Sequence, residues 1–313
     1  MRTVISFILI LSGTFSFGQK KQVCFTFDDL PAFTLSFGSN EFQRDLLKKT
    51  LLTLNKHRIP AIGFVNEFKL FNTNKLDTSK IKLLTMWLDA GIDLGNHTFS
   101  HIDYVSASSK KYCDDIIRGE KITRPLMKSY GKSLTYFRHP YLHIGESQAK
   151  VDSLQAFLAS QSYIEAPATM VNSDWLFAYA YDSAMVKRDT ALMKYIGISY
   201  VAYMEQKLKY FERQSIKLFE RNIKHVLLIH ASILNADYLD ELIEMYERHN
   251  YEFISLEQAL TDKAYSTKIT AFYKDGISWL YRWALSMGRN ETFFTDDPKA
   301  PDYIKKLAKT TFD

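Results

Sequence analysis

The chain has few of the residues that divide or cross-link a protein. Its 313 residues include only 7 Pro, 12 Gly and 2 Cys, and no Pro/Gly/Ser-rich segment, low-complexity tract or fixed-period repeat interrupts it. Because no linker divides it, and 46% of its residues are hydrophobic, we expect one large buried core in one domain. Whether Cys24 and Cys113 can pair depends on their geometry, and we expect two separate, mostly buried thiols.

Long runs of one charge are also missing. The net charge of +5 comes from 40 basic and 35 acidic residues that are scattered along the chain. Nucleic-acid binding usually needs a stronger and more clustered basic charge, so we expect no nucleic-acid partner.

No apolar run is long enough to span a bilayer. The run from Val4 to Phe17 follows Arg2, closes on small residues, and is shorter than the roughly 20 residues of a membrane-spanning helix. We expect residues 1–18 to be a secretory signal peptide, with a retained anchor as the alternative. The mature protein would then be periplasmic or secreted, without membrane insertion.

His97 and His101 have the spacing of a metal-ligand pair. They follow a short apolar run at 91–94, and if the chain turned into a helix there, both rings would lie on one face. Such a pair is equally typical of surface or capping histidines, so a metal site needs a third ligand.

Asp28 and Asp29 supply a candidate for that third ligand. They end a β-rich run at 22–27, where the turning chain lets both carboxylates reach one cavity. On their own, two Asp before Pro31 are also typical of a turn. Together with the histidines they predict a catalytic metal site, in which one Asp and two His leave a position open and the second Asp is free to act as a base.

Strands and helices are expected to alternate along the chain. Strands are predicted at 22–27, 61–65, 91–94, 134–137, 163–170, 225–229 and around Phe253. Helices are predicted at 41–57, 76–90, 110–130, 146–160, 237–249 and 256–262, with one or two more over 189–222. This alternation favours a parallel βα architecture. In a βα barrel, catalytic groups gather at the carboxyl ends of the strands, which is where the candidate residues fall.

Five short motifs occur in the order and at roughly the intervals of one known family. They are Thr26-Phe27-Asp28-Asp29, His97-Thr98-Phe99-Ser100-His101, Arg138-His139-Pro140-Tyr141, Ser173-Asp174-Trp175 and Leu227-Leu228-Ile229-His230. From Gln22 to about Asp262 the chain resembles the polysaccharide deacetylase family of carbohydrate esterases, the NodB-homology domain. The resemblance implies an irregular (β/α) barrel of about seven parallel strands over 22–262. Residues 263–313 would form a C-terminal extension packed on the barrel.

The chain departs from the family pattern at two places. Leu30-Pro31 stands where the family usually has Gly after the paired Asp, and Val171 stands where the fourth motif often carries a further acid. Both departures concern the substrate groove more than the metal site.

The resemblance also implies roles around the metal. Asp29, His97 and His101 would hold a divalent ion, with zinc as the first choice, and Asp28 would be the general base. Arg138 would pair with Asp28 through its guanidinium fork and orient it.

The remaining motif residues would bind substrate and donate a proton. Pro140 would fix a turn in which the backbone N–H of Tyr141 faces the developing oxyanion. His230 would be the general acid, Asp174 would orient it, and Trp175 would wall the site. We assign no metal ligand at His139 or His143.

The function implied is metal-dependent removal of acetyl groups from an N- or O-acetylated extracytoplasmic glycan or oligosaccharide. One alternative is hydrolysis of a small cyclic amide on the same barrel, which a closed pocket would favour. Another is a non-catalytic glycan-binding module, although pure binding would not need a base, three ligands and an acid together.

Overall fold

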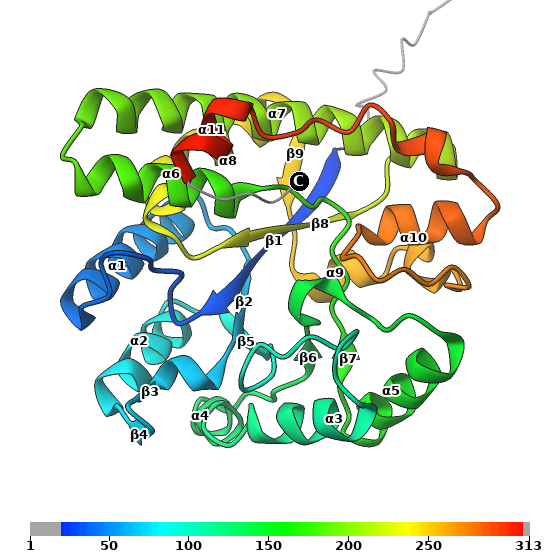
Figure 1. Ribbon diagram of the computed structural model, residues 1–313, viewed down its shortest axis with the longest axis horizontal. Coiled ribbons are helices and arrows are strands. Elements are labelled where there is room, and N and C mark those ends of the chain that lie inside the picture. Colours follow the sequence, from blue (N-terminus) through cyan, green and yellow to red (C-terminus); the bar gives the residue numbers. More distant parts are fainter. Residues whose placement is uncertain (1–19, 309–313) are drawn as a thin grey trace, which may run out of the picture.

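The computed structural model describes residues 20–308, so the predicted signal peptide lies outside the described residues. Seven parallel strands form one curved sheet with helices around it (Figure 1). The strands are β1 (Lys21–Leu30), β2 (Ile62–Val65), β5 (Asp93–Asn96), β6 (Tyr136–Phe137), β7 (Ile164–Glu165), β8 (His225–His230) and β9 (Tyr251–Phe253). Their order is β7-β6-β5-β2-β1-β8, and β9 pairs with the first residues of β1.

The segment after β7 joins the two edges of this sheet. Ala166 donates its N–H to the carbonyl of Phe137 beside β6, at 2.7 Å. Four residues later, Met170 forms a parallel bridge with Leu227 of β8. The sheet therefore closes on itself, and the predicted irregular (β/α) barrel of about seven parallel strands is confirmed. The predicted strand at 163–170 is regular only at 164–165. After these residues the segment leaves β6 and crosses to β8.

The helices cover the outside of the barrel. They are α1 (Asn40–Lys56), α2 (Thr78–Asp89), α3 (Ser109–Arg118), α4 (Thr123–Ser129), α5 (Gln148–Ser160), α6 (Asp174–Val186), α7 (Thr190–Phe219), α8 (Ile233–Arg248), α9 (Leu256–Leu260), α10 (Trp279–Ser286) and α11 (Asp302–Ala308). A small hairpin of β3 (Phe71–Asn72) and β4 (Lys75–Leu76) lies outside the barrel sheet. Side-chain caps begin several helices, among them Ser39 for α1 and Asp77 for α2.

Two helix predictions need correction. The single helix predicted at 110–130 is broken into α3 and α4, and a helix at 174–186 was not predicted at all. The sequence of α6 is apolar almost all round, and most of its residues are buried, so it shows no polar face from which a helical period can be read. In contrast, the segment predicted as helical at 189–222 forms one helix, α7 (Thr190–Phe219, 30 residues).

The barrel core is dense and both cysteines are free thiols. Cys24 is buried within β1 and Cys113 is partly buried on α3. Burial raises the pKa of Cys24 to about 12, against the opposing charge of Arg138, so this thiol stays protonated.

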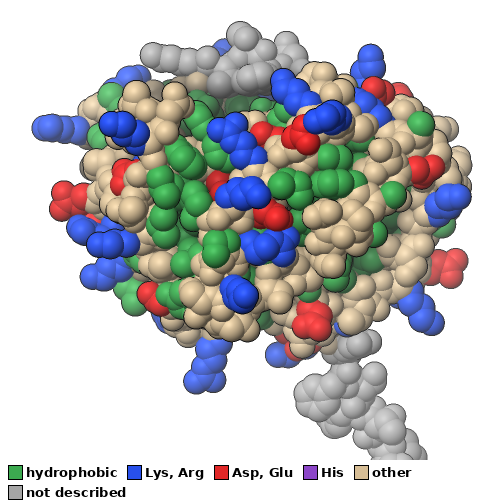
Figure 2. All heavy atoms as spheres, turned by 90° about the horizontal axis from the view of Figure 1, so that it is seen from below, with side chains coloured by type: hydrophobic (Ala, Val, Ile, Leu, Met, Phe, Trp, Pro, Cys, Tyr) green, Lys and Arg blue, Asp and Glu red, His purple; other side chains and the backbone are tan. Residues whose placement is uncertain are grey.

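On the face shown in Figure 2, acidic and basic side chains are interspersed with hydrophobic ones. Within residues 20–308, no helix has both the length and the apolar character that crossing a membrane requires.

Candidate active site

The two adjacent carboxylates reach one site because β1 contains a bulge. Phe27 pairs with Gly63 and Leu30 with Val65, so β1 uses three steps where β2 uses two. The extra residue breaks the alternation of side chains between the two faces of a strand. Asp29 takes up the change in direction with a left-handed φ of 67°. This is the backbone feature that lets Asp28 and Asp29 point into the same space.

His97 and His101 converge from an irregular loop. The expected helix between them is absent, because Thr98 and His101 have left-handed φ values of 63° and 55°. Asp115 of α3 holds this loop by accepting hydrogen bonds from the N–H and hydroxyl of Ser100. The expectation of convergence was correct, but its stated geometric reason was wrong.

Gly119 explains where α3 ends. A Cβ atom at this position would lie 2.5 Å from both the amide nitrogen of Phe99 and the carbonyl carbon of Thr98. Only glycine allows the end of the helix to press directly on the backbone of the histidine loop. Gly119 lies between α3 and α4, at the break in the segment predicted as one helix.

Asp29, His97 and His101 form a three-residue cluster with metal-ligand geometry. Their ligand atoms all lie within 4.8 Å of one another. Asp29 Oδ1 is 3.8 Å from His97 Nε2 and 3.6 Å from His101 Nε2. Ligands at zinc distances in a tetrahedral site lie roughly 3.3 Å apart, so both Asp29–histidine distances exceed this separation by less than 1 Å.

The chemistry of these three groups also fits a cation. Asp29 Oδ1 is buried without a hydrogen-bond partner in the described part of the chain. Burial opposes its ionisation, but the nearby charge of Lys69 and of the histidines outweighs burial and holds the pKa of Asp29 well below its usual range. Burial lowers the pKa of His97 and of His101 to about 4 each. At neutral pH the cluster therefore offers one carboxylate and two neutral imidazoles, the states that bind metal.

A backbone contact orients His97 for this role. Its Nδ1 lies 2.8 Å from the carbonyl oxygen of Arg138, which can only accept a hydrogen bond. Nδ1 therefore carries the ring proton, and Nε2 presents its lone pair to Asp29 and His101. Such outer contacts to a ligating histidine fix both its tautomer and its orientation.

Asp28 lies beside the cluster and is almost wholly buried. Its Oδ2 is 3.9 Å from His97 Nε2, and its Oδ1 has no hydrogen-bond partner among the described residues. Burial raises the pKa of Asp28, against the charges of Arg138 and His230, which lower it. A carboxylate with a raised pKa and a free oxygen can accept a proton from a neighbouring water.

Arg138 is close to Asp28, but the expected bidentate pairing is not present. The shortest contact joins Nη1 to Asp28 Oδ2 at 3.6 Å. Its Nη2 instead donates to Thr26 Oγ1 at 3.0 Å, and the guanidinium lies 4.7 Å from the ring centre of Phe64. The aromatic face and the Thr26 hydroxyl draw the fork away from the carboxylate, so Arg138 acts on Asp28 mainly through its charge.

His230 and Asp174 form a tight pair. The Nδ1 of His230 is 2.9 Å from Asp174 Oδ1, and its backbone N–H donates to Asp174 Oδ2 at 2.7 Å. Burial alone would lower the pKa of His230. The charge and hydrogen bond of Asp174, with smaller effects of Asp29 and Asp28, outweigh burial and raise the pKa to about 9. His230 is therefore protonated at neutral pH, as a general acid must be.

Two residues near the site had no signal in the sequence. Asn235 donates to Asp174 Oδ2 at 2.9 Å and to the carbonyl of His230 at 2.8 Å, which ties the His230–Asp174 pair to α8. Lys69 donates to the carbonyl of Asp29 at 2.9 Å. Neither belongs to a recognisable motif, and each is brought to the site only by the fold.

Aromatic rings lie close to two of the candidate residues, His230 and His101. Near His230, the ring centre of Phe33 lies 5.0 Å from that of His230 and 6.1 Å from that of Tyr179. The ring centre of Tyr179 lies 6.3 Å from that of Trp175. The ring of Tyr141 lies 4.4 Å from that of His101 and is 55% exposed. Pro140 begins the short 3-10 turn Pro140–Leu142 that carries Tyr141.

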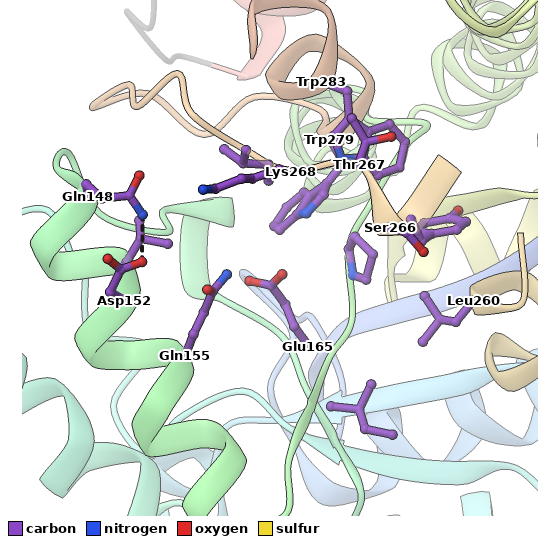
Figure 3. A pocket seen from close by; sticks show the side chains of 15 residues that line it. Gln148, Asp152, Gln155, Glu165, Leu260, Ser266, Thr267, Lys268, Trp279 and Trp283 are labelled. Carbon is purple, nitrogen blue, oxygen red and sulfur yellow. Dashed lines mark hydrogen bonds between the residues drawn. The ribbon is translucent and has the colours of Figure 1, made fainter. Parts of the chain in front are cut away.

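A separate pocket of about 530 Å³ lies between α5 and the chain segment before α10 (Figure 3). None of the metal-cluster residues lines it. Glu165 does, and it is 2.6 Å from Nε2 of His139, the residue that follows Arg138. His143 is likewise held by a carboxylate, with Asp103 at 2.6 Å from its Nδ1. Both histidines left out of the ligand set thus contact carboxylates elsewhere.

Comparison with known proteins points to one family. A family model described as polysaccharide deacetylase matches residues 17–156. The peptidoglycan-N-acetylglucosamine deacetylase of Bacillus cereus is 30% identical over 146 residues, a region that covers 46% of this chain and 44% of that protein. The chain therefore spans less than half the length of this curated relative.

Two solved structures that match part of this chain are a deacetylase and a pseudoenzyme. The peptidoglycan deacetylase PdaC of Bacillus subtilis matches with a TM-score of 0.48 and 19% identity, covering 78% of this chain and 91% of the other. A family 4 carbohydrate esterase pseudoenzyme from Bacillus anthracis matches with a TM-score of 0.47 and 17% identity, covering 77% and 66%. At this distance neither structure bears on the chemistry of this chain.

Proposed function

We propose, on the premise that the chain belongs to the polysaccharide deacetylase family through residues 17–156, that it is a metal-dependent hydrolase acting on an acetylated glycan outside the cytoplasm. The observation that carries the proposal is that the two adjacent carboxylates at the end of β1 have different surroundings. Asp29 joins two neutral histidines, while Asp28 keeps a free, buried oxygen beside them. The substrate would carry N- or O-acetyl groups.

Asp29, His97 and His101 are the residues that would hold the ion. Bound there, a divalent ion such as zinc would supply Lewis-acid chemistry, lowering the pKa of water and polarising the acetyl carbonyl. A set of two imidazoles and one carboxylate with an open position is typical of catalytic rather than structural zinc.

Asp28 would accept the proton of the attacking water. Its free Oδ1 provides the acceptor, and burial raises its pKa toward the working pH, which strengthens it as a base. The charge of Arg138 at 3.6 Å would keep enough of it ionised to act.

The backbone N–H of Tyr141 would donate to the oxygen on which negative charge develops. His230 would then give its proton to the departing nitrogen or oxygen. The buried Asp174 carboxylate would stabilise the charged imidazole, and it accepts one hydrogen bond from the ring Nδ1 and one from the backbone N–H of His230. Trp175 would contribute to the aromatic wall that contacts the sugar.

The cyclic-amide hydrolase remains the second candidate from the sequence. Tyr141 is half exposed at the site, which favours access for a polymer over a closed pocket for a small molecule. The deciding experiment measures acetate release from acetylated polymers, acetylated oligosaccharides and small cyclic amides, with zinc-loaded and chelated protein side by side. Zinc-dependent acetate release supports the proposal, and cleavage of cyclic amides alone would replace it.

His230→Ala should separate the proton donor from the rest of the machinery. We expect acetate release from an N-acetylated substrate to fall by about 10²-fold or more, while hydrolysis of nitrophenyl acetate falls much less. An amine leaves poorly unless protonated, whereas nitrophenolate leaves readily without help. Activity of the wild type on the amide should also decline as pH rises through about 9, where His230 loses its proton.

The matched control is His249→Ala, which removes a histidine paired with Glu205 away from the site. Both activities of this control should stay near wild type. Equal losses on the two substrates at unchanged metal content would assign His230 to charge stabilisation and require another proton donor.

A further inference from the structure

The turn that carries Tyr141 has an unfavourable backbone conformation. Tyr141 and Leu142 both have a φ of 56°, in the left-handed region that residues other than glycine seldom adopt. Hydrogen bonds from Leu142 N to His139 O (3.0 Å) and from His143 N to Pro140 O (3.1 Å) close the turn locally. Consecutive residues in this region persist only where the surrounding structure holds them.

Arg282 of α10 holds this turn from the C-terminal side. It is wholly buried, and its Nη2 donates to the carbonyl of Leu142 at 2.9 Å and to that of Asp275 at 3.3 Å. Within residues 20–308 Arg282 forms no ion pair with a carboxylate, its Nε and Nη1 have no hydrogen-bond partner, and its guanidinium lies 5.6 Å from the ring centre of Trp279. Burying a cation without a paired carboxylate costs free energy. The hydrogen bonds that Arg282 donates to these two carbonyl groups offset part of that cost.

Gly276 presses on the same turn. A Cβ atom at this position would lie 1.7 Å from the carbonyl oxygen of Tyr141 and 2.9 Å from its carbonyl carbon. Because the clash is with backbone, any larger residue must displace the turn or the segment itself. Gly276 is therefore required for the close approach of the two backbones.

The helix that bears Arg282 is itself fixed to the barrel. Ser278 Oγ donates to the carbonyl of Thr169 at 2.7 Å, and the N–H of Trp279 donates to that of Ala168 at 2.9 Å. Figure 3 shows Trp279 and Trp283 of α10 pointing into the pocket that Glu165 also lines. A rigid connection thus runs from the segment that closes the barrel, through α10, to the turn.

We propose that Gly276 and Arg282 are positioning residues that hold the backbone N–H of Tyr141 toward the developing oxyanion, an inference that rests on the deacetylase function proposed above. Such a donor contributes only if it is held in place before the reaction. A displacement of about 1 Å is enough to cost roughly 10²-fold in rate. The segment after the barrel is then part of the catalytic machinery rather than a cover for its surface.

The test compares Gly276→Ala and Arg282→Met with matched controls. Gly38→Ala adds a methyl group where nothing lies within 4 Å, and Arg289→Met removes an exposed arginine. We expect kcat for an acetylated substrate to fall by about 10²-fold in both test variants, with KM and metal content near wild type. Arg282→Lys, which keeps one charged donor, should retain more activity than Arg282→Met.

Hydrogen exchange of a peptide spanning residues 138–144 gives a second readout that needs no turnover. We expect faster exchange in both test variants and none of this change in the controls. Unchanged exchange, or faster exchange with unchanged kcat, would overturn the positioning role. If the wild type releases no acetate, the proposed function fails, and the exchange result still decides whether these residues hold the turn.

Discussion

Asp28→Asn should abolish most turnover while leaving the metal bound. The amide has nearly the shape of the carboxylate but cannot accept a proton, so we expect kcat to fall by about 10³-fold, within the usual range for a general base. This corresponds to about 4 kcal/mol of transition-state stabilisation. Acetate release under saturating substrate and elemental analysis of the same preparation provide the two measurements.

The Asp28→Asn variant is informative because kcat and metal content are measured separately. Asp28 Oδ2 is 3.9 Å from His97 Nε2, outside the three-residue ligand cluster, so metal stoichiometry should match wild type. Asp45→Asn, an exposed aspartate on α1, is the matched control and should change neither quantity. Undiminished kcat with full metal content would remove Asp28 from the role of base.

Asp29→Ala should produce the opposite pattern, losing metal and activity together. Asp29 Oδ1 is the atom that both histidine Nε2 atoms approach, at 3.8 and 3.6 Å. Removing it leaves two ligands, and we expect metal affinity to fall by more than the roughly 10–100-fold that outer contacts of a metal site contribute. Activity should fall to the level of chelated wild type.

Elemental analysis after dialysis against zinc, and calorimetric titration with zinc, measure this effect. Asp114→Ala on the exposed side of α3 is the control and should bind zinc as wild type does. Equal metal content in Asp29→Ala and wild type would refute the assignment of Asp29 as a ligand. Together, the Asp28 and Asp29 variants test whether adjacent carboxylates have separate roles.

The strand-helix alternation and the residues that gather at the strand ends were predictable from local sequence patterns. Hydrophobic runs followed by polar motifs mark where β1, β5, β6 and β8 end, and parallel strands bring those ends to one edge of the sheet. The alternation and the motif order therefore predicted both the barrel and the proximity of its candidate residues.

Local patterns could not reveal how those residues converge. The bulge in β1 and the irregular loop between His97 and His101 depend on contacts with β2, α3 and Gly119, which lie elsewhere in the chain. For the same reason the guanidinium of Arg138 turned toward Thr26 and Phe64 instead of forming the expected fork with Asp28.

Only the tertiary structure brought distant, unmarked residues to the site. Asn235 and Lys69 belong to no motif. Arg282 contacts the Tyr141 turn at Leu142, although the two residues are 140 positions apart in the sequence. A single side chain far away in sequence leaves no periodic signal, because its role arises from packing rather than from its neighbours. Chemistry carried by short motifs can thus be read from the chain, whereas the contacts that hold those motifs in position are decided by the fold.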